Sequence, residues 1–136
     1  MLRRLVFLLA LVAPAAFAQT PCTSGSAGGY ACDGVDLMSH LPRSTFVSPG
    51  SVAPSAMNDI WGWTDAASGR EFALAGATNG VAFVEVTDPA NPVFLGKLPT
   101  ATFSSSWRDV KVYADHAFMS VRRATTGCRS STSRGC

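Results

Sequence analysis

The sequence predicts an all-β protein built from antiparallel four-stranded units. Between residues 58 and 99 lie four short apolar runs, rich in aromatic and β-branched residues and separated by turn-forming residues. This is the pattern of short strands joined by hairpins. Part of the pattern recurs roughly 50 residues later, a period typical of β-propeller blades. We therefore expect a β-propeller fragment, with one complete four-stranded blade and part of a second, after a signal peptide.

The four apolar runs are the expected strands, and they cover residues 60–63, 72–75, 81–86 and 93–98. A polar loop that ends in glycine, residues 65–69, separates the first two. Asn79 and Gly80 favour a type I′ hairpin turn, in which both central residues need positive φ. Before the fourth run, Pro89 and Pro92 fix φ and withhold hydrogen-bond donors. Three successive hairpins make a four-stranded meander.

The repeat aligns the first two strands of the blade with a later segment. Residues 58–63 match residues 108–113 at an offset of 50, and residues 70–74 match residues 115–119 at an offset of 45. An aspartate, a β-branched residue and an aromatic ring recur at matching places. The repeat positions that we expect to be structural are Asp59, Trp61, Trp63, Asp109 and Tyr113. The blades are therefore expected over residues 57–121.

Residues 1–18 have the form of a secretory signal peptide. Arg3 and Arg4 precede an apolar run over residues 5–12, and an Ala-Phe-Ala sequence ends at Ala18. The alternative is a transmembrane anchor, which needs about 20 apolar residues, and Pro14 interrupts this run. We expect cleavage near Gln19 and a secreted, extracellular or cell-surface product. Membrane contact would then occur only through the signal peptide during export.

Residues 19–56 are expected to form an extended leader that carries a disulfide. Cys22 and Cys32 enclose a Gly/Ser-rich loop that closes easily, and an exported chain meets oxidising surroundings. Closure of so small a loop stabilises by about 2–3 kcal/mol. A zinc site would need a second cysteine or histidine pair nearby. We therefore expect a structural disulfide that holds the N-terminal segment.

Residues 122–136 differ abruptly in composition from the rest of the chain. They contain four arginines, two cysteines and no acidic residue, whereas residues 19–121 contain five basic and nine acidic residues, a formal charge of −4. A basic tail can bind nucleic acid or anionic membrane, and an exported cysteine pair can form a crosslink. We favour a tail that belongs to no fold, disordered or translated out of frame, and expect no nucleic-acid partner.

A reading-frame argument makes that hypothesis specific. Codons for residues 127–136 exist that, read from the third base, encode MQVFDLTRL. This peptide resembles residues 81–87, VAFVEVT, the third strand of the complete blade. It also falls where the partial second blade needs its third strand.

The chain contains few residues arranged for catalysis or metal binding. It has no G-x-S-x-G motif, and His40 and His116 are its only histidines. Asp59 and Asp109 begin matching strands, where they could bind a cation in a channel, but we expect hydrogen bonds to neighbouring backbone. Exposed tryptophans can stack on sugars, yet packing between blades is the expected role of Trp61 and Trp63. We therefore predict no catalytic residue, metal or cofactor.

Several long segments resemble the LVIVD-repeat proteins, and specifically the choice-of-anchor B family of bacterial secreted proteins. They are NDIWGWTD, GREFALAG, GVAFVEVTDPANPVFLGKLPT and SSSWRDVKVYADHAF, preceded by a C-x9-C spacing and VDLMSHLP. The resemblance covers residues 22–119. It implies a β-propeller at the cell surface or released, often followed by a C-terminal sorting or anchoring domain. It does not imply a particular activity.

This chain departs from the resemblance by containing only one and a half blades, so we expect an open apolar face and marginal stability or aggregation. The leading hypothesis is a non-enzymatic binding or scaffolding protein, whose partners are a surface protein or glycan and the remaining blades of a longer chain. One alternative is a fragment of a propeller hydrolase with catalytic residues in other blades. Another is a small basic secreted effector with a Cys128–Cys136 disulfide.

Overall fold

The computed structural model describes residues 19–122 of the chain. The expected signal peptide and the basic tail beyond Arg122 lie outside the described residues. The described part contains β-strands and one short 3-10 helix. In chain order these are β1 (Ser26–Ala27), β2 (Tyr30–Ala31), η1 (Arg43–Thr45), β3 (Met57–Thr64), β4 (Glu71–Ala77), β5 (Gly80–Glu85), β6 (Val93–Pro99), β7 (Arg108–Tyr113) and β8 (His116–Val121).

Strands β3, β4, β5 and β6 form one antiparallel sheet in that order. This confirms the predicted four-stranded meander. Strands β7 and β8 form a separate antiparallel hairpin, which corresponds to the first two strands of the expected second blade. Within residues 19–122 the strands do not close into a propeller ring.

The turn between β4 and β5 differs from the prediction. Ala77 pairs directly with Gly80, so Thr78 and Asn79 make the turn, and Asn79 does not have positive φ. The type I′ turn predicted at Asn79-Gly80 is therefore wrong. Glycine is needed at position 80 for a different reason, because a Cβ there would lie 2.2 Å from the carbonyl oxygen of Leu98.

Paired positive φ values occur instead between β7 and β8. Ala114 and Asp115 have φ of 46° and 59°, and Tyr113 pairs with His116 across the turn. Two central residues with positive φ are what a type I′ hairpin requires. This turn could not be predicted from the sequence, because alanine adopts positive φ only at an energetic cost and is not a usual residue of such turns.

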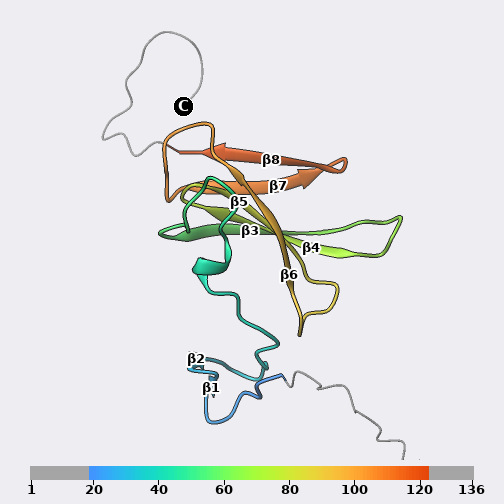
Figure 1. Ribbon diagram of the computed structural model, residues 1–136. Coiled ribbons are helices and arrows are strands. Elements are labelled where there is room, and N and C mark those ends of the chain that lie inside the picture. The colour runs from blue at the N-terminus through green and yellow to red at the C-terminus, as the bar shows by residue number, and fades with distance from the viewer. Residues whose placement is uncertain (1–18, 123–136) are drawn as a thin grey trace, which may run out of the picture.

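Both faces of the sheet are apolar. Successive side chains along a strand point to opposite faces, and apolar residues occur at both sets of positions. On one face, Ala82 and Val84 pack with Phe46 of the leader. On the other face, Leu74 and Val81 pack with Val110 of β7. Figure 1 shows the β7–β8 hairpin across one face of the sheet and η1 at the opposite face. The described residues thus form three layers.

The leader is held on the sheet by a buried lysine. Lys97 of β6 is 6% exposed, and its Nζ donates hydrogen bonds to the Val52 carbonyl at 2.6 Å and to Asn79 Oδ1 at 3.2 Å. The backbone amide of Lys97 donates to Ser48 Oγ at 2.8 Å. Burial lowers the pKa of Lys97. The leader therefore supplies one acceptor in place of water and the β4–β5 turn supplies the other.

The first part of the leader forms a small disulfide-closed unit. Cys22 and Cys32 are bonded, with Cα atoms 5.9 Å apart, which confirms the predicted disulfide. The β1–β2 hairpin lies inside the closed loop, and backbone hydrogen bonds between Thr20 and Leu37 close its base. Figure 1 shows this unit at some distance from the sheets.

Gly76 of β4 permits the closest approach between the sheet and the hairpin. A Cβ at this position would lie 2.6 Å from the carbonyl oxygen of Arg108 and 3.5 Å from Val110 Cγ2. Real Cβ atoms do not come so close to backbone, so any larger residue must separate the two layers. The spacing of the layers is therefore set at Gly76.

We predict that Gly76→Ala destabilises the protein by about 1–3 kcal/mol, the usual cost of overpacking a well-packed site. The matched control is Gly62→Ala in β3, where an added Cβ meets nothing within 4 Å. Urea unfolding of both variants measures the difference. Equal midpoints for the two variants would show that β7 does not depend on Gly76.

Candidate functional site

The candidate site is the junction between the sheet and the β7–β8 hairpin, together with the cavity beside it. Asp59 of β3 lies at this junction, where its Oδ2 accepts a hydrogen bond from the Val110 amide at 2.9 Å. Lys111 Nζ lies 3.8 Å from the same oxygen. The pKa of Asp59 is lowered, mainly by the Val110 hydrogen bond and to a smaller extent by the Ile60 amide and the Lys111 charge. Asp59 thus binds backbone of the neighbouring repeat.

Arg108 joins the same two layers from the hairpin side. It is 3% exposed, and its Nε donates to the Ala77 carbonyl at 2.8 Å. In return, Asn58 Nδ2 donates to the Arg108 carbonyl at 3.3 Å. Burial lowers the pKa of Arg108, and its Nη2 has no acceptor among the described residues. Asn58 and Arg108, which occupy matching repeat positions, therefore each donate a hydrogen bond to backbone of the other layer.

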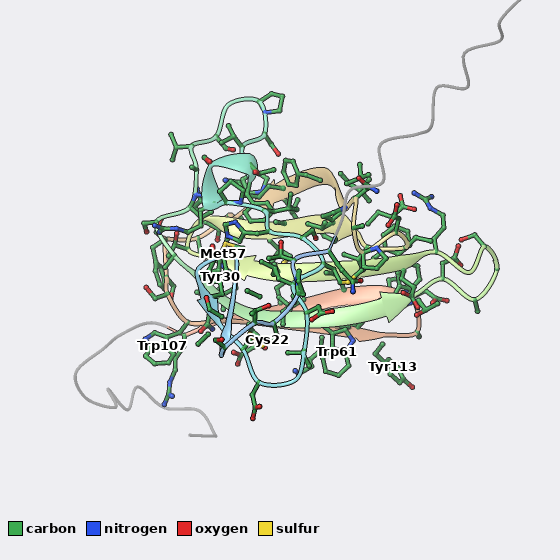
Figure 2. The ribbon with its side chains drawn as sticks, turned by 90° about the horizontal axis from the view of Figure 1, so that it is seen from below. Cys22, Tyr30, Met57, Trp61, Trp107 and Tyr113 are labelled. Carbon is green, nitrogen blue, oxygen red and sulfur yellow. A yellow bond between two sulfur atoms is a disulfide. The ribbon has the colours of Figure 1, made fainter. Side chains whose placement is uncertain are left out.

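The three aromatic repeat residues have different surroundings. Trp63 stacks on Phe72 with ring centroids 5.3 Å apart and packs against the apolar cluster under the hairpin. Trp61 carries the Lys111 ammonium 4.2 Å from its ring centroid. Tyr113 is 77% exposed. Figure 2 shows Trp61 and Tyr113 on one side of the molecule, with exposed Trp107 along the same side.

The remaining predicted position, Asp109, is exposed on β7. Its side chain makes no hydrogen bond or ion pair within residues 19–122. It occupies the place in the second repeat that Asp59 occupies in the first. The same residue type is therefore bound to a following strand in one repeat and exposed in the other.

A cavity of about 560 Å³ opens beside the hairpin. Its walls are apolar and come mainly from the face of the sheet that the hairpin covers incompletely. The lining includes Trp63, Phe72, Leu74, Phe83, Leu95 and Leu98, with Val112 and Ala117 from the hairpin. Leu95 and Leu98 remain 50% exposed. The cavity is thus a continuation of the apolar cluster under β7, over the outer strands of the sheet.

Strand β8 borders this cavity and has an unused edge. Within the described residues it pairs only with β7. Val112 pairs with Ala117, and Val110 pairs with Met119, so Ala117 and Met119 share the face that is turned toward the sheet. The strand sequence, HAFMSV, contains no Asp, Glu, Lys or Arg. Charges that commonly protect an edge strand from pairing are therefore absent from β8.

Sequence reasoning missed three features of the site: Arg108, Gly76 and the cavity. Arg108 had one available signal, since it aligns with Asn58 in the repeat. Its burial was not expected because isolated arginines are rarely buried. The cavity depends on which strands the hairpin covers, and that is a tertiary property.

The histidines lie outside this junction. His40 Nε2 is 2.9 Å from the Tyr30 hydroxyl in the leader, and His116 Nδ1 lies 2.5 Å from the Ala114 carbonyl at the β7–β8 turn. Over residues 19–122 there is no group of three or more His, Cys, Asp or Glu residues placed to hold a metal ion. In the same range, no helix has the length and hydropathy needed to cross a membrane.

Comparison with known proteins finds no protein-family model that matches the chain, and no match among curated proteins or solved structures. The resemblance to LVIVD-repeat proteins therefore stays a prediction. The junction and the cavity are the features from which function has to be argued.

We predict that Asp59→Asn flattens the acid part of the stability profile. A carboxylate whose folded pKa is lowered contributes stability above its unfolded pKa of about 4, and that contribution is lost as pH falls through the folded value. Asparagine keeps an oxygen acceptor for the Val110 amide but cannot titrate. Thermal unfolding from pH 7 to pH 2.5 should show a smaller acid-induced fall than in the wild type.

The control for this prediction is Asp109→Asn, which changes the same residue type at the matching repeat position. Its acid profile should follow that of the wild type more closely than the Asp59→Asn profile does. If Asp59→Asn and the wild type lose stability in parallel as pH falls, the Asp59–Val110 contact does not link the two layers in solution.

Proposed function

We propose that this chain is an exported β-propeller repeat segment with a non-enzymatic binding or scaffolding role. The single observation that carries the proposal is the junction of the two repeats. Asp59, in the first strand of one repeat, binds the Val110 amide in the first strand of the next. Repeat units that bury their faces against neighbours in this way are the basis of propellers and related arrays.

The packing order supports a blade-on-blade arrangement. β7 contacts both β3 and β4, and the β7–β8 hairpin aligns in sequence with β3 and β4. Two copies of the same supersecondary unit therefore stack face to face. The outward side of the hairpin carries Tyr113 and Phe118, which are exposed, as expected where a further unit could pack.

The polar groups at the junction support binding over chemistry. Asp59, Asn58 and Arg108 are each engaged with backbone of the facing repeat. Such hydrogen bonds fix the relative position of the two layers. Three exposed aromatic side chains, Trp61, Trp107 and Tyr113, lie along one side of the molecule (Figure 2).

Export is supported by the form of residues 1–18 and by the Cys22–Cys32 bond. Disulfides persist mainly in oxidising compartments. We predict that the chain expressed from its own gene in a bacterial host is recovered outside the cytoplasm. Mass spectrometry should find an N-terminus near Gln19 and one internal disulfide between Cys22 and Cys32. Recovery of the uncleaved chain in the cytoplasm, with both thiols free, would contradict export.

The binding role predicts a surface that depends on the exposed aromatics. Aromatic rings at a binding surface supply large contact areas. The Trp61→Ala/Tyr113→Ala double variant should bind washed host cells about ten-fold or more weakly than the wild type, measured with fluorescently labelled protein. Val35→Ala is the matched control, because Val35 is an exposed leader residue.

Pretreatment of the cells identifies the class of partner. Loss of binding after protease treatment indicates a surface protein, and loss after periodate oxidation indicates a glycan. If the wild type shows no saturable binding, or if the double variant binds as well as the wild type, these aromatics do not form a binding surface.

A further inference from the structure

We propose that the edge of β8 and the adjoining cavity form an acceptor site for one extended peptide strand, supplied by another polypeptide. The occupant has apolar side chains at alternate positions and pairs with β8 through its backbone. This inference goes beyond the proposed function, because it requires only the strand edge and the cavity. It does not depend on export or on a complete propeller.

The first observation is that the edge and the cavity lie side by side. Ala117 of β8 lines the cavity, and Met119 is on the same face of the strand. Residues directly opposite each other in an antiparallel pair project to the same face. A strand added to β8 would therefore direct every second side chain toward the cavity. Strand addition of this kind obtains affinity from backbone hydrogen bonds and specificity from pockets for alternate side chains.

The second observation is continuity with an interface that already exists. The cavity walls contributed by Trp63, Phe72 and Phe83 also belong to the apolar cluster under β7. Val110, in the same cluster, is fully buried. An occupant beside β8 would extend this packed layer over Leu95 and Leu98, which are now half exposed. Burial of this apolar surface would stabilise the complex.

The third observation identifies the chemistry of the occupant. In the complete sheet, the strand beside β4 is β5, in which Ala82 pairs with Ala75 and Val84 pairs with Ala73. Ile60 pairs with Ala75, and its repeat counterpart Val110 pairs with Met119, so Met119 and Ala117 correspond to Ala75 and Ala73. A strand with the chemistry of β5 would thus place alanine opposite Met119 and valine opposite Ala117, on the face that is turned toward the sheet. The site selects an alternating apolar strand with small or β-branched residues at these two positions.

Other occupants available within this chain fit less well. Residues 122–136 contain no apolar residue larger than Ala124, so they cannot fill an apolar cavity. In a second copy, β5 is already paired on both edges, with β4 and with β6. Both are less suitable than a separate polypeptide with the alternation described above, and they become outcomes of the test.

The test uses the full exported chain and a fluorescein-labelled synthetic peptide, GVAFVEVT, which copies residues 80–87. Fluorescence anisotropy should show saturable binding. Hydrogen exchange should show new protection of backbone amides within residues 116–121 when the peptide is bound. Replacing the valine that follows the peptide phenylalanine, which corresponds to Val84, with aspartate should weaken binding about ten- to a hundred-fold, because roughly 1.5–3 kcal/mol of burial is lost.

Two variants of the protein locate the site. Leu95→Lys places a charge in the cavity wall and should weaken peptide binding by ten-fold or more. Val93→Lys is the matched control, because Val93 lies on the same strand, is similarly exposed and does not line the cavity. Circular dichroism establishes that both variants fold, and hydrogen exchange gives a readout that is independent of affinity.

Several outcomes would overturn the proposal. Equal binding by Leu95→Lys and Val93→Lys, or binding without protection of β8, means that the peptide attaches elsewhere. If a chain ending at Arg122 binds the peptide and the full chain does not, the tail occupies the site. If β8 is protected without peptide in a concentration-dependent dimer, a second copy occupies it.

Discussion

The structure depends on one close backbone approach, at Gly76 against the carbonyl of Arg108. Only a residue without Cβ allows β7 to lie so near β4. That proximity brings the Val110 amide within reach of Asp59 and the Arg108 side chain within reach of the Ala77 carbonyl. It also allows Val110 to be completely buried. The polar and apolar contacts of the junction therefore depend on the same close approach of β7 to β4.

The leader and the β7–β8 hairpin are attached to the sheet by the same kind of interaction, a hydrogen bond from a buried cation to a backbone carbonyl. Lys97 reaches from the sheet to a carbonyl of the leader, and Arg108 reaches from the hairpin to a carbonyl of the sheet. Both cations are buried, and in both burial lowers the pKa. With each cover in place, the hydrogen bond to backbone partly offsets the cost of burying the charge. Each cover is thus held by more than apolar contact.

The strands were predictable because alternation and turn residues are local signals. The prediction located β3 to β6 and their order, and the repeat located the β7–β8 hairpin. The prediction failed at Asn79-Gly80. Glycine is required at position 80 because a Cβ there would clash with the Leu98 carbonyl on another strand, and not because of the turn conformation. The buried Arg108 and the cavity could not be predicted for a similar reason. They arise from tertiary contacts between segments that are distant in sequence, and local sequence patterns do not predict such contacts.

The two proposed surfaces would select partners by different physics. Strands β3 and β7 present Asp59, Lys111 and Trp61, which form an ion pair and a cation–π contact close to solvent. Contacts made there weaken as salt screens the charges. The cavity beside β8 is lined mainly by apolar side chains, with Lys97 and Asp115 as its charged residues, so a strand bound there is selected chiefly by backbone pairing and apolar burial, which salt weakens less. The charged surface on β3 and β7 is thus separate from the apolar surface beside β8. A chain of such repeats would use the apolar surface to assemble while the charged surface stays free for other partners.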